Sequence, residues 1–469
     1  MLFNSIDFAI FLPIVFFVYW FFANRDITVR NVLILMSSYI FYGFWDIRFL
    51  SLIIFSSFVD FYVGLALRKV NAGAKRKLLL LLSIGVNLGF LGFFKYYNFF
   101  LDSFVSAFSL FGNEISTNRL NIILPVGISF YTFQTLSYTV DIYKNKLEPT
   151  RDIIAFFSFV SFFPQLVAGP IERASNLLPQ FFSKKVFVYS TFTEGLKLIV
   201  WGFFLKVVVA DRAAIYVNAV YNNVEFHEGL SFIAATILFA FQIYGDFAGY
   251  SLIAIGTAKL FGFNLMDNFN RPYFSGSVSE FWKRWHISLS TWFRDYLYIP
   301  LGGNRVSKPK WLFNLFLTFL ISGLWHGADW TFIIWGALNG IYLILEVLFK
   351  KNNNKSFIHI VITFLLIDFA WIFFRSNSLG DAMLIITKIF TNPGKLYIGM
   401  GADITAPVYA ALAILILVLV EFKREYFDHV FLFSQSNRAT IKMAAYAFLV
   451  FVIMYLGVFD EGQFIYFQF

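Results

Sequence analysis

The chain contains no cysteine among its 469 residues, and only 14% of its residues are charged. The absence of cysteine excludes disulfides, iron–sulfur clusters, a thiol nucleophile and palmitoylation of this chain. A soluble domain with so few charged side chains could not cover its own exterior. The small charged fraction therefore indicates a protein whose exterior lies largely in lipid.

Several motifs that would define a reaction are also missing from the sequence. It has no G-x-S-x-G elbow, which argues against a serine hydrolase, and no G-x-x-x-x-G-K-[ST] loop, which argues against an ATP-driven pump. It has no HExxH or HxxH pair, so we expect no metal site. No basic stretch alternates with aromatic residues in a polar context, so we expect no nucleic-acid partner.

What the chain has in abundance is apolar and aromatic sequence. Hydrophobic residues make up 59% of it and aromatic residues 22%, including 66 phenylalanines, and its mean hydropathy is +0.70. These values are typical of a polytopic membrane protein. The N-terminus lacks a basic region and a cleavage site, so we expect an uncleaved first span rather than a signal peptide. We predict an all-α integral membrane protein in which residues 1–469 form one domain of about eleven to thirteen membrane segments.

Ten apolar runs are long enough to be predicted as membrane segments. They cover Ile6–Ala23, Asn31–Phe44, Phe49–Leu67, Leu78–Phe100, Leu120–Tyr143, Trp311–Trp325, Thr331–Phe349, Ile358–Phe374, Ala406–Phe422 and Lys442–Val458. The formal charge of +9 gives them a direction, because basic residues in short loops favour the cytoplasm. Basic loops follow alternate runs, at 25–30, 68–77, 144–151, 305–310, 350–355 and 423–424. We therefore expect both termini outside the cytoplasm.

The middle of the chain departs from this simple pattern. Prolines and glycines interrupt Phe156–Phe182, which predicts a broken or re-entrant helix lining a cavity, although ordinary loops would give a similar sequence. Thr191–Val217 is predicted to be a helix with several charged residues. The run Leu230–Phe263 is long enough for a bent span or a hairpin, with Asp246 at its centre. A carboxylate at that depth needs a partner, so a structural ion pair and a functional role both stay open.

Three glycine pairs with GxxxG spacing predict close contact between helices. They are Gly85/Gly89, Gly245/Gly249 and Gly336/Gly340. A glycine lets two backbones approach closely, and such pairs carry no information about substrate.

Two of the five histidines lie in the most unusual segments of the chain. His286 follows FWKRW, and His326 stands between Trp325 and Gly327 at the end of an apolar run. Imidazole is well suited to proton transfer near neutral pH. His326 lies sixteen residues after Lys310, or about 24 Å of helix, which predicts a position beyond the bilayer midplane. From the residues alone a general base, a metal ligand, a proton relay and a structural role stay open, with metal disfavoured.

The segments FNRPYFSGSVSEFWKRWHISLSTWFRDYLYIPLGGNR (269–305) and SGLWHGADWTFIIWG (322–336) closely resemble the membrane-bound O-acyltransferase (MBOAT) family. Within that family the chain is similar to the bacterial branch that acetylates alginate and peptidoglycan. Further similar stretches are SFYTFQTLSYTVDIY (129–143), FFPQLVAGPIER (162–173), QIYGDFAGYSLIAIG (242–256) and GQFIYFQF (462–469).

The resemblance implies a fold, a reaction and a site. The fold is a ring of helices around a central tunnel, and the reaction moves an acetyl group from a cytoplasmic thioester, acetyl-CoA, toward a hydroxyl outside. His326 corresponds to the near-invariant catalytic histidine and His286 to the second one, which orients the acyl group, donates to the oxyanion or holds the tunnel wall. The implied tunnel and substrate-binding residues are Asp246, Tyr244, Trp325, Arg173, Arg294 and Asn304. Arg173, Lys283, Arg284 and Arg294 are also candidates for contact with the donor's phosphates.

The same resemblance implies the surroundings of the enzyme. We expect a multi-pass protein of the bacterial cytoplasmic membrane, with no bound cofactor, acetyl-CoA as donor substrate and a polysaccharide as final acceptor. Because we expect no soluble outer domain to grip a sugar, an extracytoplasmic SGNH-like acetyltransferase is the expected partner. Two alternatives remain: D-alanyl transfer to teichoic acid from a carrier protein, and a non-enzymatic polymer exporter.

Overall fold

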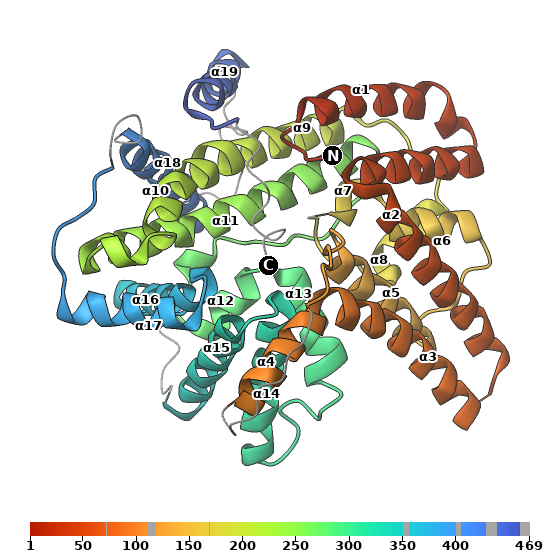
Figure 1. Cartoon of the computed structure of the whole chain (residues 1–469). Coiled ribbons are helices and arrows are strands. Elements are labelled where there is room, and N and C mark those ends of the chain that lie inside the picture. The colour runs from red at the N-terminus through yellow and green to blue at the C-terminus, as the bar shows by residue number, and fades with distance from the viewer. Residues whose placement is uncertain are drawn as a thin grey trace. The chain divides into compact units, whose positions relative to one another are not determined.

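The computed structural model describes residues 1–71, 73–109, 119–167, 169–349, 356–399, 405–427 and 439–459. The regular structure of these residues is helical, and they contain no strand (Figure 1). Seven of the described helical segments are long and apolar enough to cross a bilayer. The predicted all-α membrane fold is therefore confirmed. The GQFIYFQF tail at 462–469 and the basic residues at 350–355 lie outside the described residues.

The chain divides into two compact units. Unit 1 comprises residues 1–196 and 254–266, and unit 2 comprises residues 197–253 and 267–469. The helices that lie wholly in unit 1 are α1 (Ile6–Phe21), α2 (Ile27–Lys69), α3 (Ala74–Leu91), α4 (Tyr97–Ser109), α5 (Ile128–Tyr143), α6 (Ile153–Val160), α7 (Phe163–Leu166) and α8 (Ala174–Leu177). The shorter helical turns of this unit are η1 (Ala23–Arg25), η2 (Gly92–Tyr96) and η3 (Leu178–Phe181).

Unit 2 holds both segments that carry the two histidines, residues 269–305 and 322–336. Its helices are α10 (Asp211–Tyr221), α12 (Val278–Arg284), α13 (Ile287–Phe293), α14 (Lys308–His326), α15 (Trp330–Phe349), α16 (Phe357–Arg375), α17 (Leu379–Thr391), α18 (Ala406–Tyr426) and α19 (Ala439–Leu456). Its short turns are η4 (Phe204–Ala210), η5 (Val224–Phe226), η6 (Pro272–Phe274) and η7 (Arg294–Tyr298). Two long helices, α9 (Tyr189–Phe203) and α11 (Gly229–Leu260), begin in one unit and end in the other. The prediction of a single membrane domain stays a prediction.

Helix α2 contains two of the predicted runs. It is 43 residues long and bends at Asp46, whose backbone is extended (φ −162°, ψ 114°). The Asp46 carboxylate accepts hydrogen bonds from the backbone and guanidinium of Arg48, which holds the bend at the short polar break between the runs. Asp26 caps the start of the helix, because its side chain accepts a hydrogen bond from the backbone N–H of Val29.

The predicted span Leu120–Tyr143 is helical only from Ile128 onward. Pro125 restricts the residue before it, and Gly127 has a left-handed backbone (φ 74°) immediately before α5. These two residues delay the helix start, so the first part of the prediction is wrong.

The prediction of broken helices for Phe156–Phe182 is confirmed, and that of a cavity along them stays a prediction. Helix α6 ends at Val160, and short helical pieces follow it. Irregular backbone at membrane depth needs internal partners. Buried Arg30 supplies them, because its guanidinium donates to the carbonyl oxygens of Phe181 and Ser183, both at 2.6 Å.

The predicted charged helix Thr191–Val217 and the long apolar run Leu230–Phe263 are both continuously helical. Helix α9 passes through the π-helical turn η4 into α10 without a break, which confirms the predicted helix. The run predicted as a bent span or a hairpin is a single helix, α11, of 32 residues.

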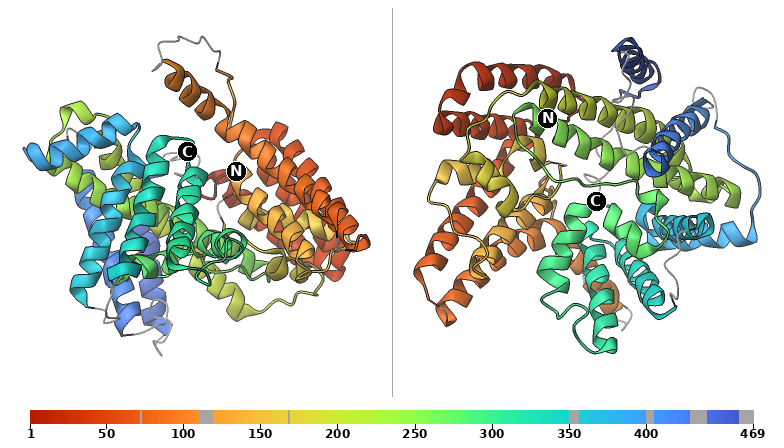
Figure 2. Two further views of the ribbon diagram at one scale, coloured as in Figure 1. Left: turned by 90° about the horizontal axis from the view of Figure 1, so that it is seen from below. Right: turned by 180° about the vertical axis from the view of Figure 1, so that it is seen from behind.

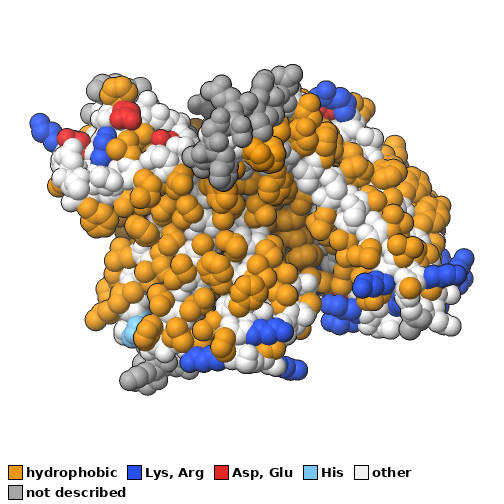
Figure 3. All heavy atoms as spheres, turned by 60° about the horizontal axis from the view of Figure 1, so that its bottom comes forward, with side chains coloured by type: hydrophobic (Ala, Val, Ile, Leu, Met, Phe, Trp, Pro, Cys, Tyr) orange, Lys and Arg blue, Asp and Glu red, His pale blue; other side chains and the backbone are white. Residues whose placement is uncertain are grey.

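The exterior of the described residues is apolar. In Figure 3 hydrophobic side chains cover most of the visible face, and Lys and Arg side chains gather at its margins. Exposed isoleucine, leucine and phenylalanine side chains occur along the candidate spans. Such a surface suits a hydrocarbon solvent rather than water.

Helices α14 and α15 form a close hairpin within unit 2, and Figures 1 and 2 both show them side by side. A Cβ added at Gly323 would lie 2.3 Å from the carbonyl oxygen of Phe332, and one at Gly336 would lie 2.4 Å from that of Phe319. Gly245 and Gly249 likewise approach the backbone of Leu205 and Gly202. The close-contact prediction is thus confirmed for the second and third glycine pairs. It is wrong for Gly85/Gly89, where a Cβ would meet nothing within 4 Å.

This contrast gives a matched pair of variants. We expect Gly336→Ala to separate α14 from α15 and to destabilise the protein by about 1–3 kcal/mol, as overpacking does. Gly85→Ala, whose Cβ meets open space, should leave stability nearly unchanged. Thermal unfolding of both variants in detergent measures the difference, and equal midpoints would contradict the packing described here.

Candidate active site

His326 is the last residue of α14 and is buried, with 5% of its surface exposed. The edge-on ring of Trp335 lies 5.0 Å from its imidazole between centroids, and Phe374 lies at 5.6 Å. The close approach of α15 at Gly323 brings Trp335 to this position. The imidazole is therefore held rigidly among aromatic rings and away from bulk solvent.

A cluster of four tryptophans connects the two histidine segments. Trp335 stacks on Trp371 at 5.8 Å, and Trp371 contacts Trp285 at 5.2 Å. Trp282 packs edge-on against Trp335 at 5.6 Å. Because Trp285 directly precedes His286, this cluster fixes the second histidine relative to the first.

His286 lies between α12 and α13 and is 2% exposed. Its backbone is left-handed (φ 43°), which is unusual for a residue with a Cβ and marks local strain. Its Nδ1 lies 3.0 Å from Oδ1 of Asn268, and Phe247 packs edge-on at 4.4 Å. Burial holds the pKa of His286 well below its ordinary value, and the neighbouring His326 lowers the pKa further.

A cavity of about 420 Å³ begins at His286. Its wall is mostly apolar, with a polar group formed by Ser279, Ser290, Thr291, Thr318 and Ser322. Lys283 and Arg294 also line it. Arg294 is 58% exposed and pairs with Asp295 at 2.7 Å, so it lies at the solvent side of the cavity. A predominantly apolar pocket with a few polar groups is typical of a small-molecule site.

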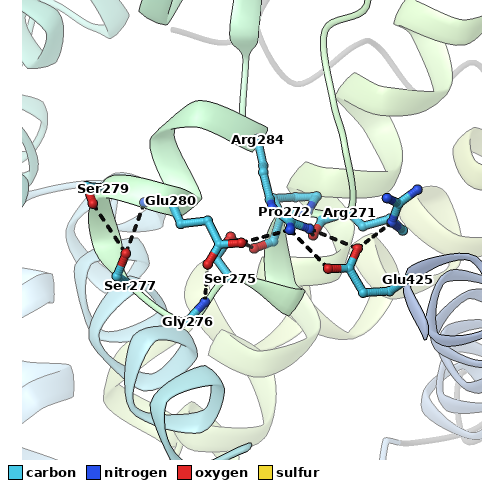
Figure 4. A network of polar contacts seen from close by, with 9 residues as sticks. All are labelled: Arg271, Pro272, Ser275, Gly276, Ser277, Ser279, Glu280, Arg284 and Glu425. Carbon is cyan, nitrogen blue, oxygen red and sulfur yellow. Dashed lines mark hydrogen bonds and ion pairs between the residues drawn. The ribbon is translucent and has the colours of Figure 1, made fainter. Parts of the chain in front are cut away.

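A charged network braces the segment before His286 (Figure 4). Glu425 accepts from Arg271 at 2.7 Å and from Arg284 at 3.0 Å, and Arg284 also pairs with Glu280 at 2.7 Å. Ser277 caps α12 by accepting from the backbone of Glu280. Arg284 is therefore engaged by two carboxylates and lies outside the cavity lining, whose basic side chains are Lys283 and Arg294.

Two of the predicted tunnel residues, Asp246 and Tyr244, each have a buried side-chain partner. Asp246 forms an ion pair with Lys206 at 2.7 Å, and Lys206 also donates to Asp211 at 2.8 Å. Tyr244 donates a short hydrogen bond to Glu421 and packs near Trp285, at 6.0 Å between rings. These contacts give both residues a structural partner, whereas a contact with substrate stays a prediction.

The other predicted residues are dispersed. Trp325 is half-buried on α14, and Asn304 is exposed in the turn before that helix. Arg173 lies in unit 1 at the start of α8. The described residues contain no group of three or more His, Cys, Asp or Glu that could hold a metal ion.

Two residues that the sequence analysis did not single out prove central to these contacts. Asn268 faces His286, and Lys206 partners Asp246. Asn268 stands one residue before the segment that resembles the family. Lys206 lies forty residues from Asp246 along the chain, so no local pattern pairs them.

Glu172, beside Arg173, forms a buried clamp within unit 1. Its carboxyl accepts hydrogen bonds from the side chain of Asn176 at 2.7 Å and from the backbone of Met266 at 2.5 Å. Burial raises the pKa of Glu172 from 4.5 to about 7, against the lowering effect of these hydrogen bonds. The folded protein therefore binds this proton more tightly than the unfolded chain does.

It follows that the contribution of Glu172 to stability is fully present below about pH 4.5 and is lost as the pH rises toward about 7. We expect Glu172→Gln, which cannot ionise, to remove this part of the pH dependence. Unfolding midpoints of wild type and variant between pH 4.5 and 8 measure it. Glu148→Gln is the control, because the Glu148 side chain is 82% exposed. Parallel wild-type and Glu172→Gln curves would contradict the assignment.

The apolar helices define an integral membrane protein, and within unit 2 it holds two buried histidines, one of which lines a cavity. Residues 150–379 match the model of the MBOAT, membrane-bound O-acyltransferase family. Together with relatives about 40% identical over most of the chain, this match shows that the chain belongs to the MBOAT family. It is an acyltransferase of the O-acetyltransferase type, so the alternative of a non-enzymatic exporter is set aside.

Curated relatives place it within the family. It is 41% identical over 401 residues to the probable alginate O-acetylase AlgI of Pseudomonas putida, covering 83% of this chain and 80% of that protein. It is 37% identical over 425 residues to the peptidoglycan O-acetyltransferase of Helicobacter pylori, covering 82% and 79%. The teichoic acid D-alanyltransferase of Bacillus subtilis is 28% identical over 278 residues, or 55% of this chain and 70% of that protein.

Proposed function

We propose that this enzyme moves an acetyl group from cytoplasmic acetyl-CoA across the membrane for O-acetylation of an extracytoplasmic polysaccharide. The observation that carries the proposal is the pair of buried histidines, one of which lines a cavity that also holds Lys283 and Arg294. The names of the alginate and peptidoglycan relatives support acetyl as the group and a polysaccharide as the final acceptor.

In the proposed step His326 acts as the general base. The attacking hydroxyl gives its proton to the imidazole, its oxygen bonds to the thioester carbonyl carbon, and the carbon–sulfur bond breaks. The imidazolium then returns the proton to the departing thiolate, so the products are an acetyl ester and free CoA thiol.

The helix ends favour His326 over His286 as the base. His326 ends a helix of 19 residues, where the partial negative charge of the helix terminus stabilises an imidazolium. His286 precedes the first turn of α13, where the partial positive charge opposes one. The site therefore favours proton uptake at His326 and a neutral His286.

Lys283 and Arg294 are the residues that we propose for the donor's phosphates. They line the same cavity as His286, and a cationic side chain gives a phosphate strong, charge-assisted hydrogen bonds. The apolar remainder of the wall suits the acyl and pantetheine portion of the donor.

The donor is tested by comparing two thioesters with the purified chain in nanodiscs. We expect acetyl-CoA to be consumed and a D-alanyl carrier protein to be inert. Consumption of the carrier thioester alone would instead favour the D-alanyl alternative, for which the Bacillus subtilis relative offers weaker similarity.

We also propose that the acetyl group passes to a separate SGNH-like enzyme outside the membrane before it reaches the glycan. The support is the apolar character of the described helices, which offer few polar groups to grip a sugar. Liposomes with acetyl-CoA inside and glycan outside should acetylate the glycan only after the partner is added. Efficient acetylation by the chain alone would refute the relay.

The proposed location is the bacterial cytoplasmic membrane, with the 68–77 loop in the cytoplasm and both termini outside. Five basic residues in that loop support this orientation. A single cysteine at Asn71 should resist a membrane-impermeant thiol reagent in intact cells and react after permeabilisation. Labelling in intact cells would show that the 68–77 loop lies outside, which would contradict the proposed orientation.

A further inference from the structure

The Asn268 side chain occupies the space beside His286 and is 1% exposed. Its Nδ2 donates to Oγ of Ser251 on α11 at 3.0 Å. Its Oδ1 lies 3.0 Å from Nδ1 of His286 and 2.8 Å from Oγ of Ser288. One amide thus bridges α11 and the turn that carries the second histidine.

A backbone group decides which way this amide points. The N–H of Ser288 lies 3.3 Å from Oδ1 of Asn268, and a backbone N–H can only donate. The atom it faces must therefore be the oxygen, which leaves the amide nitrogen for Ser251. Nδ1 of His286 faces this acceptor at 3.0 Å, and the Ser288 hydroxyl, 3.4 Å from Nδ1, donates to the same Oδ1 at 2.8 Å, so Nδ1 must carry the proton.

We infer that Asn268 is a positioning residue that holds His286 as the Nδ1–H tautomer, so that its unprotonated Nε2 serves the cavity as a hydrogen-bond acceptor. A neutral imidazole carries one proton, so protonation at Nδ1 leaves a lone pair at Nε2. His286 lines the cavity while its Nδ1 is turned to Asn268, and Nε2 is the ring nitrogen that remains for a ligand.

The backbone around Asn268 holds the same arrangement. The N–H of Ile287 donates to the carbonyl oxygen of Asn268 at 2.9 Å, and the N–H of Asn270 donates to that of Arg284 at 2.9 Å. These two bonds join residues 268–270 to the backbone on both sides of His286 and stabilise its left-handed backbone. The side-chain and backbone contacts of Asn268 therefore act on the same residue, and both fix the imidazole's direction.

This inference rests on the proposed function and narrows it. A neutral His286 with a bare Nε2 cannot donate to the oxyanion of the transition state. It can accept a hydrogen bond from an O–H or N–H group of the bound substrate, which orients that group beside His326. Of the three roles implied for His286, the structure thus favours orientation of the substrate.

The tautomer can be observed directly by ¹⁵N NMR of the full chain in nanodiscs, labelled in its histidine rings. The His286 signals are assigned by their loss in His286→Gln. In wild type at neutral pH we expect Nδ1 to be protonated and Nε2 to be bare. A proton on Nε2 of His286 in wild type would overturn the inference without any measurement of activity.

Variants of Asn268 supply the second readout. Asn268→Ala should shift the His286 proton toward Nε2 and lower turnover by about 10–100-fold, the size of loss that follows when the partner orienting a metal-bound histidine is removed. Asn268→Asp keeps an acceptor, so it should retain the Nδ1–H form and shift the acidic limb of the pH–rate profile upward. Asn270→Ala is the matched control, because the Asn270 side chain is exposed on the same segment.

If His286 kept its Nδ1–H tautomer in Asn268→Ala, the inference would be overturned. If that variant does not accumulate, the spectra of wild type and Asn268→Asp decide the question. The test separates this inference from the proposed function. Should His326→Ala keep its turnover while His286 shows the Nδ1–H form, the general-base proposal falls and the tautomer assignment stands.

Discussion

Replacing His326 with alanine is expected to reduce turnover of the thioester donor by about 10²–10⁴-fold, the usual contribution of a general base. The imidazole is fixed at the end of α14 by Trp335 and Phe374. Removing it leaves the tryptophan cluster and the cavity wall in place, so the protein should still fold. The measurement is the initial rate of CoA release by purified protein.

His359→Ala provides the matched control. His359 is exposed near the start of α16 and contacts Ser356, so its loss should leave the rate unchanged. If His326→Ala kept wild-type turnover, the proposed role as base would be wrong. If the variant failed to accumulate, its histidine would have a structural role instead.

The second large effect is expected at Lys206, on the π-helical turn η4. Lys206 is 1% exposed and pairs with both Asp211 and Asp246. Lys206→Met would leave two buried carboxylates without a countercharge, and loss of one partner from a buried pair typically costs about 3–5 kcal/mol. Denaturant unfolding followed by tryptophan fluorescence measures this cost.

Lys259→Met is the corresponding control on a more exposed pair. Lys259 lies 3.2 Å from Glu194, whose side chain is 58% exposed, and such surface pairs contribute about 0–1 kcal/mol. Converting Asp211 and Asp246 to asparagine in the Lys206→Met background should recover part of the lost stability. Equal destabilisation by the two lysine variants would contradict a buried triad.

The class and most helices could be predicted from the sequence because long apolar runs are local signals. The family could be predicted because the segments around His286 and His326 are so distinctive. The breaks around Pro164 and Pro179 follow from a residue that disfavours the helix interior. The bend at Asp46 falls where two charged residues interrupt the apolar sequence. The late start of α5 was missed because Pro125 and Gly127 lie inside an otherwise apolar run.

The contacts between distant segments could not be predicted in this way. Spacing alone cannot distinguish Gly85, which faces open space, from Gly336, which meets a neighbouring backbone. The partner of Asp246 lies on another helix, and the partner of His286 lies across a turn. These pairings depend on tertiary packing. The two histidines could be singled out from the sequence because their segments are so unusual in composition, and both are buried in the structure, but their catalytic role stays a prediction.

Vectorial acetyl transfer in sealed liposomes tests the central claim most directly. Labelled acetyl-CoA is enclosed on the side of the 68–77 loop, a hydroxyl acceptor with its partner enzyme is supplied on the other side, and acetyl ester and released CoA are counted together. We expect one ester outside for each CoA released inside with wild type, and neither product above background with His326→Ala. Ester formed only on the donor side, or equal rates for wild type and variant, would contradict the account.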